Sequence, residues 1–270
     1  SRISADRYGG IMSVIALASR PTHALITDAT LRRLIEDGHE VNDISSPDDL
    51  GERATAVFVA TDPPAVPSLV DALATSATRP RVVLLSSPAA PHERSLPDDQ
   101  QWFLPAERSL ESSGLDWVIV RPVGLMAAAL SWRDDIASTG TVRHPLINAA
   151  YPHVHEDDVA DVVAACLLAS DHDGRKLMVT GPESVTPIEQ TEALSSALGR
   201  PLVIEELSYD EARERWREAG WDEDSIELEL ALLSDYLDQA PQVRDTVERV
   251  TGDGGRSFRE WAVDHVDDFR

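Results

Sequence analysis

Short apolar runs alternate with amphipathic segments along the first half of the chain. Residues 13–19 (SVIALAS) form an apolar run that ends before Arg20, which is typical of a strand buried on both faces of a sheet. Residues 28–37 carry leucine and isoleucine at helical spacing and stop at Gly38, a common helix end. The same criteria predict strands at 41–44, 55–60, 81–85 and 117–120, and helices at 69–75 and 100–113. This alternation predicts an α/β fold with a doubly wound, Rossmann-like parallel sheet.

The second half of the chain is more helical and more acidic than the first. Its pattern predicts helices at 157–169 and 187–198, a strand at 176–180 and an acidic helical region at 209–237. From residue 201 onward the chain has 20 acidic and 8 basic residues. We expect three parts, namely an N-terminal tail at 1–12, a Rossmann-like core at 13–122, and remaining core elements interleaved with a smaller, mostly helical substrate-binding region at 123–270.

Charge and cysteine content restrict the partners of this chain. The 48 acidic and 24 basic residues give a net charge of -24, which repels nucleic-acid phosphates and anionic lipid. No run approaches the about 18 apolar residues that cross a bilayer. Cys166 is the only cysteine and lies in an apolar run, so we interpret it as a buried hydrophobe in a reducing compartment. We expect a cytoplasmic protein that binds a small-molecule metabolite, with no nucleic acid and no membrane partner, while a homo-oligomer stays open.

Several short motifs, in a fixed order, carry a resemblance to a known family. They are DGHEV at 37–41, RVVLLSS at 81–87, ERSLESSGLDWVIVRP at 107–122, HEDDVAD at 155–161, VTGPE at 179–183, and the segments VTG and SFREW between 250 and 261. Over roughly residues 13–270 the chain resembles the NmrA-like branch of the atypical short-chain dehydrogenase/reductase family. The resemblance implies a Rossmann fold that ordinarily binds NAD(P) through a Gly-x-x-Gly-x-x-Gly turn after the first strand.

This turn lacks all three glycines in the present chain. Counted back from Gly38, the glycine positions fall on Pro21, Ala24 and Thr27. Proline removes a backbone donor, while alanine and threonine each add a Cβ where the phosphate is expected. At the end of the second strand Asp43 is the one candidate for the cofactor ribose. We therefore expect a degenerate, inactive cofactor turn and no cofactor, although these residues do not exclude NAD(P).

The reductase motif Tyr-x-x-x-Lys of the wider superfamily is also missing. Lys176 is the only lysine, and His172 occupies the position four residues before it. Histidine and carboxylate groups can still act as acid or base, and serine and arginine can hold a developing oxyanion. The candidate catalytic residues are Ser87, His92, Glu107 and His155, and the candidate substrate-binding residues are Ser86, Trp102, Arg121 and His153.

These residues favour a non-redox enzyme that acts on an apolar metabolite of specialised metabolism, as a cofactor-independent isomerase, cyclase or lyase. An NAD(P)-dependent reductase with an unusual cofactor mode is one alternative, and a non-catalytic ligand-sensing or regulatory protein is another. Structural roles also stay open, with Glu107 as a solvated or capping residue and the two serines as partners of backbone groups. The pair His153 and His155 has the spacing of metal ligands, but the resemblance predicts no metal.

Overall fold

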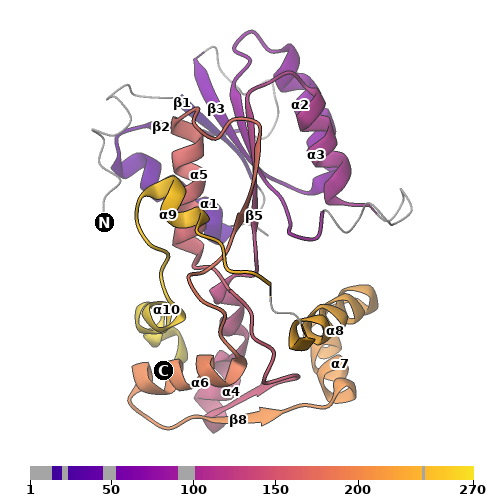
Figure 1. The fold of residues 1–270 in the computed structure, drawn as a ribbon, viewed down its shortest axis with the longest axis vertical. Helices are drawn as coiled ribbons and strands as arrows, with labels where there is room; N and C mark the ends of the chain where they lie inside the picture. Colours follow the sequence, from indigo (N-terminus) through magenta and orange to yellow (C-terminus); the bar gives the residue numbers. More distant parts are fainter. Residues whose placement is uncertain (1–13, 20–23, 45–52, 91–100, 239–240) are drawn as a thin grey trace. The chain divides into compact units, whose positions relative to one another are not determined.

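The computed structural model describes residues 14–19, 24–44, 53–90, 101–238 and 241–270 (Figure 1). The chain divides into two compact units. The first unit comprises residues 1–123, 156–179 and 245–254, and the second comprises 124–155, 180–244 and 255–270.

The first unit is built on a six-stranded parallel sheet. Its strands are β1 (Val14–Ser19), β2 (Glu40–Asp43), β3 (Ala54–Ala60), β4 (Arg81–Leu85), β5 (Trp117–Pro122) and β7 (Arg175–Val179), in the order β2-β1-β3-β4-β5-β7. The order reverses at β1, since β2 lies on one side of β1 and all later strands lie on the other. Open sheets of this kind bind ligands at the carboxyl ends of the strands beside such a reversal. The predicted doubly wound α/β fold is confirmed.

Helices cover both faces of this sheet (Figure 1). The helices α2 (Val66–Thr75) and α3 (Phe103–Ser112) pack against each other on one face, and α1 (Ala24–Glu36) and α5 (Glu156–Leu168) pack against each other on the opposite face. The short helix α9 (Thr246–Thr251) packs against α5.

Alternation along the central strands fills both faces with apolar side chains. Val57, Val59 and Ile119 share one buried cluster with Val70 of α2 and Leu110 of α3. The residues between them on the strands are buried as well, as a parallel sheet covered on both faces requires.

Cys166 lies on α5 and is fully buried. Burial raises the pKa of the Cys166 thiol to about 12, so the thiol stays protonated. Its interpretation as a small buried hydrophobe is confirmed.

The second unit is mostly helical. It contains a two-stranded parallel sheet of β6 (Thr141–His144) and β8 (Val203–Glu206). Its helices are η7 (Met126–Trp132), α4 (Arg133–Thr139), α6 (Pro187–Leu198), α7 (Tyr209–Glu218), α8 (Glu223–Asp238), α10 (Phe258–Asp264) and η8 (Val266–Phe269). A Ser or Thr with a glutamate three residues later forms a capping box at the start of α6, α7 and α10.

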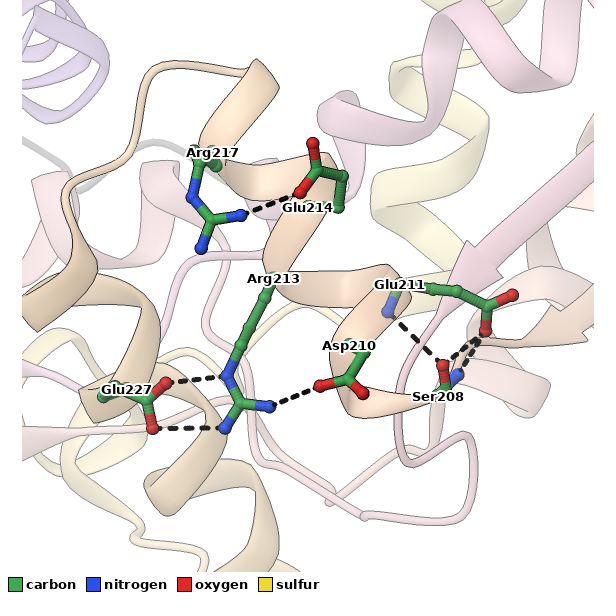
Figure 2. A network of polar contacts seen from close by, with 7 residues as sticks. All are labelled: Ser208, Asp210, Glu211, Arg213, Glu214, Arg217 and Glu227. Atoms are coloured by element: carbon green, nitrogen blue, oxygen red, sulfur yellow. Dashed lines mark hydrogen bonds and ion pairs between the residues drawn. The ribbon is translucent and has the colours of Figure 1, made fainter.

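The helices α7 and α8 form a hairpin with a network of polar contacts between and along them (Figure 2). Arg213 on α7 donates from Nε to Glu227 Oε1 on α8 at 2.7 Å and lies 3.2 Å from Asp210. Between the same two helices, Ile226 and its neighbours Ala212 and Leu230 form a small buried cluster. Among the described residues, no helix combines the length and the apolar character that crossing a bilayer requires.

Candidate functional site

The carboxyl edge of the sheet beside β1 offers an anion-binding geometry. β1 ends at Ser19 and α1 begins at Ala24, so only four residues, which lie outside the described part of the chain, separate the reversal point of the sheet from a helix N-terminus. The first N–H groups of a helix have no partner within the helix and carry a partial positive charge. The first turn of α1 contains no acidic residue that would oppose an anion there. These features fit the pyrophosphate of a dinucleotide.

The residues at the expected glycine positions differ in where they lie relative to α1. Ala24 is the first residue of α1, and Thr27 is a buried residue within the helix. The third glycine of the motif serves close packing between helix and sheet, and the packing of α1 accommodates the Thr27 side chain. The Thr27 hydroxyl is buried and finds no hydrogen-bond partner among the described residues. Pro21 lies outside the described residues, as does His92.

Ser86 and Ser87 follow directly after β4, at the same edge of the sheet. The Ser86 N–H donates to Val120 O at 2.8 Å, which extends the pairing of β4 with β5. The Ser86 hydroxyl donates to Glu107 Oε1 at 2.6 Å. The Ser87 hydroxyl instead accepts a hydrogen bond from the backbone N–H of Ala89 at 3.1 Å. The two neighbouring serines therefore have different hydrogen-bond partners.

Glu107 is the centre of a buried ionic network under α3. Its side chain is 0% exposed, and Arg121 Nε donates to its Oε1 at 2.8 Å while Arg121 Nη2 pairs with its Oε2. Lys176 Nζ lies 3.2 Å from the same Oε2 and 2.8 Å from Glu111 Oε1. With Ser86 included, each oxygen of the Glu107 carboxylate has two donors or cations around it.

Strand register brings these groups together. Ile119 of β5 pairs with Lys176 of β7, and Arg121 is two residues further along β5, so all three side chains leave the sheet on the face that α3 covers. Burial by itself would raise the pKa of Glu107, but hydrogen bonds from Arg121 and Ser86 and the nearby cationic charges outweigh it and lower the pKa. Glu107 is therefore ionised at neutral pH.

Two other candidate residues belong to the second unit. His153 Nδ1 lies 3.1 Å from Gln190 Nε2, and the Tyr151 ring meets the His153 ring edge to face at 4.8 Å. Burial lowers the pKa of His153 to about 4, so this imidazole is neutral at pH 7. His155 is buried, and its Nε2 lies 4.0 Å from Asp264 Oδ2.

Only some of the expected site residues contact one another in the structure. Ser86, Glu107 and Arg121 contact one another, while Trp102 is 62% exposed at the start of α3. Lys176 and Glu111 were not expected in the network. A lysine early in a mostly apolar strand was the available signal, because such a charge needs an acidic partner. Among the described residues, no group of three or more His, Cys, Asp or Glu could hold a metal ion.

Comparison with known proteins identifies the family. A family model described as NAD(P)H-binding matches residues 12–170. The chain is 36% identical over 221 residues to a (4-alkanoyl-5-oxo-2,5-dihydrofuran-3-yl)methyl phosphate reductase of Streptomyces griseus, covering 79% of this chain and 77% of that protein.

Two solved structures share the fold. The NADPH complex of the Escherichia coli quinone oxidoreductase QOR2 matches with a TM-score of 0.71 at 11% identity, over 92% of this chain and 98% of that chain. NmrA, a negative transcriptional regulator in complex with NAD, matches with a TM-score of 0.68 at 16% identity, over 95% and 96%.

These findings correct two expectations. The expected absence of a cofactor is contradicted by the NAD(P)H-binding family model, and the cofactor-independent isomerase, cyclase or lyase reading is contradicted by relatives that are named reductases. The missing glycines were given too much weight, since β1 and α1 form here without them and one of the three positions is a packing position. The relatives support an enzyme, and the fold shared with NmrA agrees with the resemblance to NmrA-like proteins. The chain belongs to the NAD(P)H-binding family.

Proposed function

We propose that this chain is an NAD(P)H-dependent reductase of a small molecule and that the cofactor binds at the carboxyl edge of the six-stranded sheet. The observation that carries the proposal is the β1–α1 unit at the reversal of strand order, inside the segment that the NAD(P)H-binding model matches. The relative that is 36% identical and named a reductase supports the same reaction type.

The residues of the first unit have the donors and acceptors that a dinucleotide needs. The N–H groups of the first turn of α1, starting at Ala24, would hold the pyrophosphate. The Thr27 hydroxyl is buried and has no hydrogen-bond partner among the described residues, so it is a further donor and acceptor beside this helix end. Ser86, at the end of β4, is half-buried and would face the other half of the cofactor, because the two halves of a dinucleotide lie on opposite sides of the reversal.

The substrate class follows from the missing Tyr-x-x-x-Lys motif and from the name of the relative. That name describes a furanone ring with an alkanoyl substituent, in which the ring double bond is conjugated to carbonyl groups. We propose that this chain reduces an electron-poor carbon–carbon double bond conjugated to a carbonyl. A nicotinamide held at this edge of the sheet would supply hydride to one carbon of that bond. The electron pair of the double bond would move to the conjugated oxygen, and the other carbon would take a proton from water, so no strongly acidic side chain would be required.

The test is consumption of NADPH or NADH by the purified chain with an alkanoyl butenolide phosphate as substrate. Oxidation of the cofactor, followed by the absorbance of the reduced nicotinamide, should depend on the butenolide. Mass spectrometry should detect the saturated lactone as the product. The saturated lactone and a simple ketone such as cyclohexanone are the controls and should give no turnover. A chain that binds neither cofactor, by calorimetry at millimolar concentration, would refute the proposal. Turnover of the ketone alone would refute the substrate class.

A further inference from the structure

The Ser86 hydroxyl has a fixed hydrogen-bond direction because of Glu107. Its proton is directed to Glu107 Oε1 at 2.6 Å, a short contact of the kind that an ionised acceptor makes. A hydroxyl has one donor and two acceptor lone pairs. Once the proton is committed to Glu107, the Ser86 oxygen can only accept hydrogen bonds from anything else that approaches it.

Glu107 has no remaining capacity for a ligand. A carboxylate offers about four lone-pair positions. Here Arg121 Nε and Ser86 occupy Oε1, and Arg121 Nη2 and Lys176 occupy Oε2. The side chain is fully buried, and its lowered pKa keeps it ionised. Glu107 can therefore affect a bound ligand only through the groups that it holds.

The position of Ser86 selects the ligand group. The N-terminus of α1 would hold the pyrophosphate, and β2 lies beyond β1 on the adenosine side of the reversal. β4 lies on the opposite side, two strands from β1, and Ser86 is the first residue after it. A donor that reaches Ser86 would therefore come from the nicotinamide-riboside half, either as a ribose O–H or as a carboxamide N–H.

We propose that Glu107 is a positioning residue that makes Ser86 a hydrogen-bond acceptor for an O–H or N–H donor on the nicotinamide-riboside half of the cofactor. This inference rests on the proposed function. It assigns Ser86 the opposite polarity to an oxyanion-binding serine, which must donate its proton. It also gives a reason for a buried charge network that costs desolvation.

The test compares binding of three ligands by calorimetry. NADPH carries both candidate donors, ADP-ribose carries the ribose hydroxyls without the carboxamide, and ADP carries neither. Ser86→Ala should weaken NADPH binding about tenfold, the effect of one hydrogen bond, and should leave ADP binding unchanged. A matching loss for ADP-ribose identifies a ribose hydroxyl as the donor, and no loss for ADP-ribose identifies the carboxamide.

Glu107→Gln tests the positioning role. It should weaken NADPH binding by no more than Ser86→Ala does, and the double variant should bind NADPH no more weakly than Ser86→Ala alone, because Glu107 acts on the cofactor only through Ser86. Ser86→Thr keeps the hydroxyl and should retain the affinity. Ser112→Ala removes an exposed hydroxyl at the far end of α3, bonded to Arg108 O, and should not change NADPH binding. If Glu107→Gln does not fold, the serine variants alone decide the question.

Three outcomes would overturn the inference. They are NADPH binding by Ser86→Ala within twofold of the wild type, an equal loss for ADP, and additive losses for Ser86→Ala and Glu107→Gln. A wild-type chain that binds no nicotinamide cofactor would overturn the proposed function itself. If the wild type binds NADPH and Ser86→Ala binds it equally well, only the inference is overturned.

Discussion

Glu107 and Arg121 form an ion pair in which both side chains are almost fully removed from water. A buried pair of this kind adds little net stability over apolar residues, but removing one partner leaves the other charge uncompensated. Arg121→Met should therefore lower the free energy of unfolding by about 3–5 kcal/mol, measured in urea. Arg217→Met is the control because Arg217 and its partner Glu223 are exposed, and it should cost less than about 1 kcal/mol. Equal costs for the two variants would contradict the assignment of a buried network.

The lowered pKa of Glu107 predicts a specific pH dependence. A carboxyl whose pKa is lower in the folded than in the unfolded state stabilises the fold above its unfolded pKa, and this contribution is lost as the pH falls through the folded value. The difference in unfolding free energy between wild type and Glu107→Gln should thus be constant near neutral pH and shrink below about pH 4. Urea unfolding at a series of pH values measures it. A difference that grows in acid would mean that burial dominates and that the pKa is raised.

The residues of the candidate site could be predicted from the sequence better than their contacts with one another. Ser86 and Arg121 could be selected from the sequence as polar groups at strand ends, and Glu107 as a carboxylate on a predicted helix. Glu107 is buried and accepts hydrogen bonds from Ser86 and Arg121 because of the register of β4, β5 and β7. The same register places Lys176 beside Glu107. Pairing between distant strands is tertiary information that periodicity does not carry.

At the scale of single elements, the strands of the six-stranded sheet and the helices α2, α3, α5 and α6 were predicted closely. The expected bounds of β4 and α6 agree with the structure, and most other bounds differ by one to three residues. Helix α1 begins at Ala24, four residues before the expected start, because residues 24–27 continue the buried face. β6 and β8 were missed since they are four residues long, and Val203 and Glu205 of β8 are exposed, which leaves no apolar run to detect.

The start of α1 gives a prediction about the cofactor. Ala24→Asp places a negative charge at the helix N-terminus, where it stabilises the helix but repels a phosphate. NADPH binding should weaken at least tenfold by calorimetry while the melting temperature stays equal or rises. Ile35→Asp adds the same charge to an exposed position eleven residues along α1, about 16 Å away, and should leave NADPH binding nearly unchanged. Equal losses for both variants would point to overall charge and not to the helix terminus.

The α7–α8 hairpin gives a second element-scale prediction. Its ion pairs, such as Arg213 with Glu227, are partly or largely exposed, whereas Ile226 is fully buried between the two helices. Exposed pairs contribute less than about 1 kcal/mol, while truncating a buried isoleucine to alanine costs about 2–5 kcal/mol. Ile226→Ala should therefore increase amide hydrogen exchange across α7 and α8, and Arg213→Met should change it little. A larger effect from Arg213→Met would show that the polar network in Figure 2 holds the hairpin.

At the scale of the whole molecule, the net charge of -24 decides the response to salt. Repulsion among the excess carboxylates destabilises the folded chain, and salt screens it as the Debye length falls from about 30 Å at 0.01 M to about 8 Å at 0.15 M. Salt also weakens exposed ion pairs, but each of these contributes less than about 1 kcal/mol, and the acidic excess is spread over the chain.

Stability should therefore rise when sodium chloride is added to a dilute buffer. Urea unfolding measures this, since guanidinium chloride would itself supply salt. Glu218→Lys provides the matched variant, because Glu218 is an exposed acid in the last turn of α7, where a cation is favourable. This variant should be more stable than wild type at low salt, and its advantage should shrink at high salt. A wild-type chain that loses stability as salt is added would show that its ion pairs, and not its net charge, govern the fold.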